Sequence, residues 1–236
     1  ISQGGNAPED PHGEFTGRNI LYLSHSLAKT AARFSLTEKE ARETLDHADR
    51  ILFTRRTARK RPHLDDKILV SWNGLMIGAL ARGGAILRQP ELIEAAAGAA
   101  RFIYSHLYNK EEGTLQRRYR EQESGIAGQL DDYAFLVSGL LELYQAEQDP
   151  QWLQWVIDLT RTQIDLFLDT GRGGFYDSAG DDSLPMKMKS DYDGAEPAPN
   201  SVAAMNLLRL SRLTGKTEWR HLAVQTMEAF SYMLNQ

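Results

Sequence analysis

Alternating apolar and amphipathic helix patterns constrain the fold of this chain more than any other feature of its sequence. They predict three helix pairs, near residues 66–108, 131–168 and 199–234. The first helix of each pair is apolar on most faces, so it should be buried on two sides, whereas the second leaves a charged face for solvent. Inner helices that alternate with outer helices indicate an α/α-toroid.

The pairs form an internal repeat with a spacing of 66 to 67 residues. Leu64-Asp65-Asp66 recurs as Leu130-Asp131-Asp132 after 66 residues, and Trp152 is followed by Trp219 after 67. Tetratricopeptide, ankyrin and HEAT repeats are shorter, at roughly 33–47 residues. We therefore predict an all-α chain in which three pairs make up about half of a six-pair ring.

The chain before the pairs divides into two parts. Residues 1–35 are rich in glycine and proline without an apolar period, so we expect an irregular lead-in segment. Thr37 and Glu40 have the spacing of a capping box and predict a helix that runs to about Thr57. With that helix, residues 36–236 would form a partial toroid of about seven long helices. Two short candidate strands lie at 115–119 and 174–177.

Composition excludes several classes of function. The 236 residues include no cysteine, so a disulfide scaffold, a thiol nucleophile and a thiolate metal site are ruled out. The net charge of −5 provides no electrostatic attraction to nucleic acid or to an anionic membrane. The six histidines show no metal-ligand spacing, and no phosphate-binding or dinucleotide-binding loop is found, so we expect neither a metal nor a cofactor.

The amino terminus carries little information about targeting. The first residue is Ile1 rather than methionine, and we interpret the chain as a piece of a longer protein. No apolar run approaches the roughly 18 residues that span a membrane. No signal peptide is visible, which favours a cytoplasmic location, while the cut amino terminus leaves the compartment open.

Carboxylates cluster before the apolar helices and are the candidate catalytic groups: Asp65, Asp66, Asp131, Asp132 and Glu196. Stacked pairs bring the amino ends of all inner helices to one mouth, so we expect Asp65, Asp131 and Glu196 to lie there together. Glycoside hydrolysis requires paired carboxylates, one as the acid and one as the base or nucleophile. The alternative is that each aspartate only caps its helix, which contributes about 0.5–2 kcal/mol.

Polar and aromatic residues around these carboxylates are candidate substrate-binding groups: His63, Lys67, Trp72, Asn73, Tyr133, Asp193 and Asn200. The indole of Trp72 would stack on a sugar ring. An Asn73-Gly74 pair inside an apolar helix is unfavourable by about 0.5–1 kcal/mol per residue, and such violations are expected at functional or tightly packed positions. Close helix packing over Gly74, with Asn73 bonded to a neighbouring loop, is the structural alternative.

These same segments carry a family resemblance. The motifs are Arg61-Pro62-His63-Leu64-Asp65-Asp66-Lys67, Ser71-Trp72-Asn73-Gly74-Leu75-Met76, Asp131-Asp132-Tyr133-Ala134 and Asp193-Gly194-Ala195-Glu196-Pro197 with Asn200-Ser201. Together they closely resemble the thioredoxin-domain family that includes spermatogenesis-associated protein 20 and its bacterial relatives. The resemblance implies a thioredoxin-like domain, which is absent from this chain, followed by a toroid similar to six-hairpin glycosidases and N-acylglucosamine 2-epimerases.

Two functions follow as hypotheses. The first is a carbohydrate-active module that performs acid/base glycoside hydrolysis or sugar isomerisation on a sugar or glycan ligand. Epimerases of this fold depend on histidines near the cavity, and only His63 is placed to match, so hydrolysis is favoured over epimerisation. The alternative is a non-catalytic helical module that binds peptides or partners for the thioredoxin-like domain.

An incomplete ring has its own consequences. Half a toroid leaves any sugar site half built, so we expect the isolated chain to be catalytically inactive. The end pairs should expose apolar side chains that missing pairs would cover, with Ile93, Ile103, Phe230 and Met233 as candidates. We therefore expect self-association through these open edges, or coverage of one edge by the amino-terminal segment.

Overall fold

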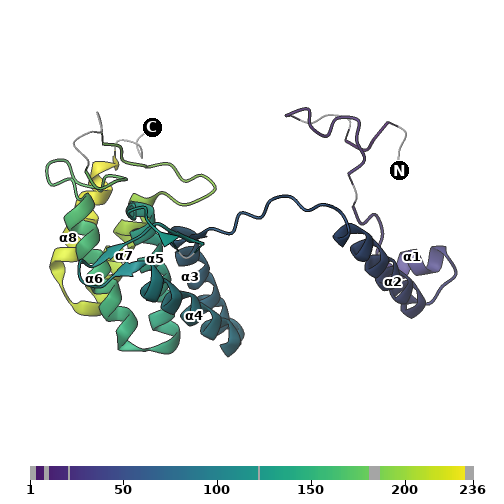
Figure 1. Cartoon of the computed structure of the whole chain (residues 1–236), viewed down its shortest axis with the longest axis horizontal. Helices are drawn as coiled ribbons and strands as arrows, with labels where there is room; N and C mark the ends of the chain where they lie inside the picture. The colour runs from purple at the N-terminus through teal and green to yellow at the C-terminus, as the bar shows by residue number, and fades with distance from the viewer. Residues whose placement is uncertain (1–3, 8–10, 21, 122, 181–186, 232–236) are drawn as a thin grey trace. The chain divides into compact units, whose positions relative to one another are not determined.

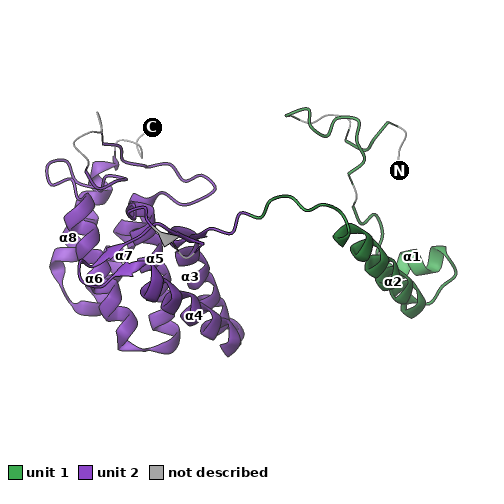
Figure 2. Ribbon diagram, viewed as in Figure 1, with its two compact units in different colours: residues 1–64 green, residues 65–236 purple. Residues whose placement is uncertain are grey.

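A computed structural model describes the chain except for residues 1–3, 8–10, 21, 122, 181–186 and 232–236 (Figure 1). The chain divides into two compact units, Ile1–Leu64 and Asp65–Gln236 (Figure 2). Unit 1 contains helices α1 (Leu27–Arg33) and α2 (Glu38–Thr57). The capping box of α2 is present, because Thr37 N donates to Glu40 Oε2 at 2.8 Å and Glu40 N donates to Thr37 Oγ1 at 3.2 Å. We expected this helix to open the partial toroid at residue 36, but it is grouped with unit 1.

Unit 2 consists of three helix pairs, which confirms the predicted all-α repeat. The inner helices are α3, α5 and α7, and the outer helices are α4, α6 and α8. Their bounds are α3 (Val70–Leu87), α4 (Pro90–His106), α5 (Leu130–Glu147), α6 (Pro150–Phe167), α7 (Pro199–Thr214) and α8 (Thr217–Ala229). Each inner helix packs against its own outer helix or its inner neighbours, and α5 contacts α3, α6 and α7. No helix in the described ranges is both long and apolar enough to cross a bilayer.

The connection inside each pair has the same geometry in all three pairs. The inner helix ends on a left-handed residue, Arg88, Gln148 or Gly215, with φ between 57° and 72°. One further residue follows, extended in the second and third pairs, and the outer helix then begins, in two cases at a proline that suits the first helical position. These two-residue turns keep paired helices adjacent and antiparallel, so all long connections lie at the other end of the inner helices.

The long connections carry short antiparallel strands. These are β1 (Ile68–Leu69), β2 (Tyr108–Asn109), β3 (Thr114–Leu115), β4 (Arg118–Arg120) and β5 (Glu123–Ser124). They form one sheet in the order β1-β4-β5 and a second of β2 and β3. The candidate strand at 115–119 is thus present in pieces, and the one at 174–177 is reduced to a bridge between Leu168 and Phe175.

The first inner helix starts later than the sequence pattern predicted. We expected it to begin near Asp66, but Ile68 and Leu69 pair with Tyr119 and Arg118, and α3 begins at Val70. Asp65 and Asp66 therefore lie before the strand and do not cap the helix. The Leu-Asp-Asp repeat is consequently not a structural repeat, since Asp131 and Asp132 stand in the first turn of α5.

The core of unit 2 surrounds α5. Leu136, Val137 and Leu140 of this helix are fully buried between the neighbouring helices. The expected open-edge residues do not match the exposed ones: Ile103 is buried, Ile93 and Phe230 are half-buried, and Met233 lies outside the described residues. Ile103 is buried because it shares the apolar face of α4 with buried alanines. Exposed apolar side chains lie instead on inner helix α3, at Trp72, Met76, Ile86 and Leu87.

Glycines allow α3 and α5 to cross at backbone contact. A Cβ at Gly74 would lie 2.5 Å from Leu136 N, and one at Gly139 would overlap the carbonyl oxygen of Gly74. The packing interpretation of Gly74 is therefore correct. Asn73 does not bond a neighbouring loop, because its Nδ2 donates to the oxygen of Leu69, the residue that precedes α3, at 2.8 Å.

Gly139→Ala should destabilise unit 2, because the new methyl group has no space at the α3–α5 crossing. We expect a loss of unfolding free energy of about 1–3 kcal/mol or more, as in overpacked cores. Gly83→Ala on α3 is the matched control, since a Cβ there meets nothing within 4 Å. Its effect should be neutral or stabilising by up to about 1 kcal/mol. Urea denaturation of both variants measures the difference, and equal effects would contradict the crossing.

Candidate functional site

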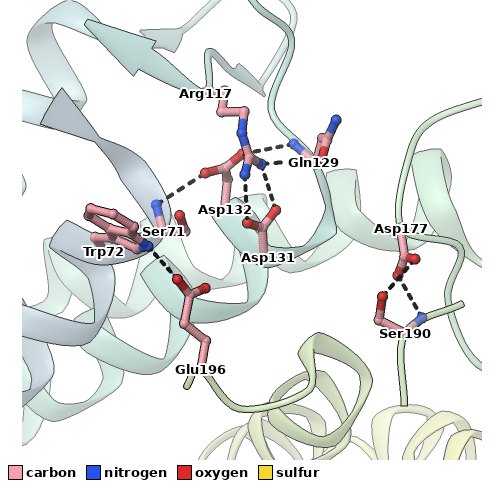
Figure 3. A network of polar contacts seen from close by, with 9 residues as sticks. All are labelled: Ser71, Trp72, Arg117, Gln129, Asp131, Asp132, Asp177, Ser190 and Glu196. Atoms are coloured by element: carbon pink, nitrogen blue, oxygen red, sulfur yellow. Dashed lines mark hydrogen bonds and ion pairs between the residues drawn. The ribbon is translucent and has the colours of Figure 1, made fainter. Parts of the chain in front are cut away.

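The amino ends of the three inner helices meet at one end of unit 2, and we call this place the inner-helix mouth. Ser71 N in the first turn of α3 donates to Asp132 Oδ1 of α5 at 3.1 Å. Trp72 Nε1 donates to Glu196 Oε1 at 2.5 Å and so joins α3 to the segment before α7 (Figure 3). Two of the candidate carboxylates from different pairs, Asp131 and Glu196, line the same pocket there, with a volume of about 460 Å³.

Arg117 lies at the centre of the mouth and binds both aspartates of α5. Its Nη1 and Nη2 donate to Asp131 Oδ1 and Oδ2 at 2.8 and 3.0 Å, which is a two-pronged ion pair (Figure 3). Nη1 also donates to Asp132 Oδ2 at 2.9 Å. The backbone of Arg117 accepts from Val70 N at 3.0 Å, so the same residue positions the start of α3.

Asp132 was a candidate acid or base, but the structure gives it a different role. Its side chain is fully buried, so it has no surface at which a substrate could reach it. Its two oxygens accept from Ser71 N, Gln129 N and Arg117 Nη1. The capping interpretation applies here, extended from one helix to two, because the carboxylate binds the first turns of both α3 and α5.

Burial controls the protonation of this carboxylate. Removal from water and, to a smaller extent, the neighbouring Asp131 carboxylate raise the pKa of Asp132. The hydrogen bond from Gln129 and the charge of Arg117 oppose this rise, and the net pKa is about 6. Hydrogen bonding to Asp131 raises the pKa of Arg117 in turn. The inner-helix mouth therefore contains a buried carboxyl group, Asp132, whose pKa is close to neutral pH, next to the permanently charged Arg117.

The aspartates of the first pair are placed differently from those of the second. Asp65 Oδ2 lies 3.1 Å from Lys67 Nζ, and the hydrogen bond from Lys67 lowers the pKa of Asp65. Asp66 Oδ1 lies 2.8 Å from Arg120 Nε of β4. Both carboxylates are exposed, and neither lines the pocket that Asp131 and Glu196 share. His63 is exposed and belongs to unit 1.

Three candidate substrate-binding residues instead hold backbone. Tyr133 is buried, and its hydroxyl accepts from Leu115 N at 2.8 Å, while burial raises its pKa to about 12. Asn200 is also buried; its Oδ1 accepts from Phe175 N at 2.7 Å and its Nδ2 donates to Phe175 O at 3.0 Å. Asp193 Oδ1 accepts from Ala198 N at 2.7 Å just before α7. These contacts shape the loops at the mouth; Tyr133 and Asn200 are buried, whereas Asp193 stays exposed.

Sequence reasoning missed several residues of the mouth. Arg117 was not singled out, although Arg117-Arg118-Tyr119-Arg120 is a basic run beside a candidate strand. Asp177 was not singled out either, and its carboxylate accepts from Ser190 N and Ser190 Oγ, both at 2.8 Å (Figure 3). Asp177 O also accepts from Leu130 N at 3.0 Å. Asp177 and Ser190 therefore form one wall of the pocket at the inner-helix mouth. Among the described residues no group of three or more histidine, aspartate or glutamate side chains is arranged to hold a metal.

The fold is that of α/α-toroid carbohydrate-active enzymes. Unit 2 resembles cellobiose 2-epimerase from Spirochaeta thermophila, with a TM-score of 0.58 and 18% identity over 70% of this chain and 43% of that one. A family 76 α-mannanase from Bacteroides thetaiotaomicron gives 0.56 and 17% over 75% and 46%. A D-mannose isomerase gives 0.56 and 12% over 87% and 56%. The match to about half of each structure agrees with the predicted half ring.

The sequence itself is similar to spermatogenesis-associated protein 20. The human protein is 41% identical over 98% of this chain, and the mouse protein is 40% identical over 96%. The resemblance predicted from the motifs is thus confirmed. This chain spans about 31% of the length of the human relative, so the thioredoxin-like domain of the family stays a prediction outside the matched region. No protein-family model matches the sequence.

Arg117→Ala should destabilise unit 2 strongly, because it leaves the buried Asp132 carboxylate without its cation. Breaking a buried pair in this way costs about 3–5 kcal/mol, and we expect the lower end because Arg117 is partly exposed. Arg118→Ala removes the adjacent arginine of β4 and is the control. Thermal and urea denaturation compare the two, and a loss confined to the Arg118 variant would refute the central role of Arg117.

Asp132 should make stability depend on pH in an unusual direction. Folding raises the pKa of Asp132 from its ordinary value of 3.8 to about 6, so the folded state holds the proton to a higher pH than the unfolded state does. Its contribution to the unfolding free energy is therefore present below pH 4 and is lost as pH rises to about 6, by roughly 3 kcal/mol. Asp132→Asn should flatten this slope, whereas Asp165→Asn, at an exposed position of α6, should keep it.

Proposed function

We propose that the inner-helix mouth is a carbohydrate site in which Trp72 and Glu196 contact the sugar. The observation that carries the proposal is the contact between them, because an exposed indole and an exposed carboxylate are held together at the rim of a pocket. Support comes from the structural relatives, whose names describe action on cellobiose, mannan or mannose. An aromatic face beside fixed polar groups is also the common composition of small-ligand sites.

The two carboxylates of the pocket suit different roles. Glu196 is exposed and receives one hydrogen bond, from the Trp72 indole, which orients it and leaves an oxygen for a substrate hydroxyl or glycosidic oxygen. Asp131 is paired with both terminal nitrogens of Arg117, so it suits the role of the ionised carboxylate rather than that of the acid that donates a proton. This division of labour is that of acid/base glycoside hydrolysis or sugar isomerisation.

We expect complete activity only in the longer protein. The solved toroids are about twice as long as the part that this chain matches, so further helix pairs would enclose the mouth from the side of α3. Trp72, Met76 and Ile86 are exposed on that helix. We therefore expect the isolated chain to bind a sugar weakly and not to turn it over, because an open site does not exclude water or surround the substrate.

A second candidate function is a helical binding module without catalysis. It is favoured by the exposed apolar row on α3, which consists of Trp72, Met76 and Ile86. It is also favoured by the structural roles of the buried polar residues Asp132, Tyr133 and Asn200. In that case the row would dock a protein surface, for which the thioredoxin-like domain is the expected partner. The two functions differ in which residues of α3 matter, because the sugar site needs Trp72 and the docking row needs the whole face.

The test uses Trp72→Ala and Met76→Ala, two truncations of exposed side chains one turn apart on α3. For the sugar site, calorimetric titration of the chain with cellobiose and mannobiose should show binding that Trp72→Ala removes and Met76→Ala retains. Trp72→Phe should weaken binding partially, because the ring stays while the hydrogen bond to Glu196 is lost. No binding of either sugar at millimolar concentration, by this chain or by the longer protein, would overturn the proposal.

A further inference from the structure

A second pocket lies on the outer layer of unit 2, between α4 and α6. It has a volume of about 280 Å³, and its walls include Tyr104 of α4, Tyr108 of β2 and Trp155 of α6. Arg101, Gln151 and Asp158 also line it and supply polar groups. It shares no residue with the inner-helix mouth, so a ligand there would be independent of the function proposed above.

The aromatic side chains in the walls of this pocket contact one another. The ring centroids of Trp155 and Tyr104 lie 4.9 Å apart at an interplanar angle of 86°, and those of Trp155 and Tyr108 lie 5.5 Å apart at 63°. Rings at these distances touch, so they leave no space for a cation enclosed between them. Lys110 Nζ already lies 4.5 Å from the centroid of the Tyr104 ring. Both observations argue against an organic cation as the ligand and favour one with an apolar face.

The polar groups of the pocket include both donors and acceptors. Arg101 only donates, Asp158 accepts, and the amide of Gln151 does both. The indole nitrogen of Trp155 is buried and has no hydrogen-bond partner among the described residues. A buried donor without an acceptor is uncommon, because the hydrogen bond to water that it loses on burial is not replaced. A ligand hydroxyl that reached this nitrogen would supply the missing acceptor.

We propose that this outer pocket binds a single pyranose unit of a carbohydrate. A pyranose ring presents C–H groups on one face and hydroxyls around its edge, which matches an aromatic wall beside mixed donors and acceptors. The volume of about 280 Å³ lies just below the range of about 300–1,000 Å³ for ligand pockets, which suits nothing larger than one monosaccharide. The site would anchor a glycan on the outer surface while the mouth lies at the ends of the inner helices.

The chain contains four tryptophans, so one NMR titration of the full chain with a glycoside can test both pockets. The indole N–H resonances in a ¹H–¹⁵N spectrum, assigned with Trp-to-Phe variants, report different places. Trp155 reports the outer pocket and Trp72 the mouth, while Trp219, bonded to Glu218 at 2.9 Å on α8, serves as the remote reference. With methyl β-D-glucopyranoside or methyl α-D-mannopyranoside, we expect the Trp155 resonance to shift and saturate while that of Trp219 stays fixed.

Two variants identify the pocket as the source of the shift. Tyr104→Ala truncates a partly exposed ring and should weaken the glycoside affinity seen at Trp155 by about tenfold. Gln151→Ala, at an exposed position, should weaken it without touching the aromatic wall. Trp72→Ala should leave it unchanged, and an unshifted Trp219 resonance shows that each variant is folded. If the inner-helix mouth does not bind the glycosides, the Trp72 resonance stays fixed while the Trp155 resonance still shifts, so the two proposals are tested separately.

Three results would overturn the inference. One is a Trp155 resonance that does not move with either glycoside at concentrations up to 100-fold above the protein. Another is an equal response to sorbitol, whose flexible hydroxylated chain lacks a ring face. The third is saturable binding of tetramethylammonium at Trp155 without glycoside binding, which would assign the pocket to cations.

Discussion

The ion pair between Arg117 and the two aspartates of α5 is the interaction on which the rest of unit 2 depends. Asp132 is completely buried, and a buried carboxylate is tolerated only when its oxygens are bonded and its charge is balanced. Arg117 supplies the charge, while Ser71 N and Gln129 N supply hydrogen bonds from two separate helix starts. One carboxylate therefore sets the relative position of α3, α5 and the strand connection that carries Arg117.

This arrangement explains why the pocket at the mouth contains one constrained and one accessible carboxylate. Asp131 completes the Arg117 fork, so it is fixed by the same charge that balances Asp132. Glu196 belongs to a long connection and reaches the mouth through Trp72. The ion-pair cluster of Arg117, Asp131 and Asp132 therefore lies next to the carboxylates of the pocket, and Arg117 couples the two electrostatically. A change of protonation at Asp132, whose pKa is about 6, would be felt first at Asp131.

Much of the candidate site follows from the sequence, but the roles within it do not. Of the three carboxylates expected to lie together before the apolar helices, Asp131 and Glu196 line one pocket, whereas Asp65 does not. Nothing local distinguishes Asp131 from Asp132, since both stand in the first turn of α5. Which of them is buried depends on where Arg117 and Ser71 arrive, and these residues come from segments 14 and 61 positions away.

By itself the sequence determined the helix pairs, their repeat and the inner and outer layers, because hydrophobic periodicity and helix caps act over a few residues. Tertiary structure decided where α3 begins, because β1 pairs with β4 and takes Ile68 and Leu69 out of the helix. It also turned Tyr133 and Asn200 from presumed ligand contacts into backbone anchors. Such roles depend on partners distant in the chain, and a one-dimensional pattern carries no information about which backbone group will be left to bond.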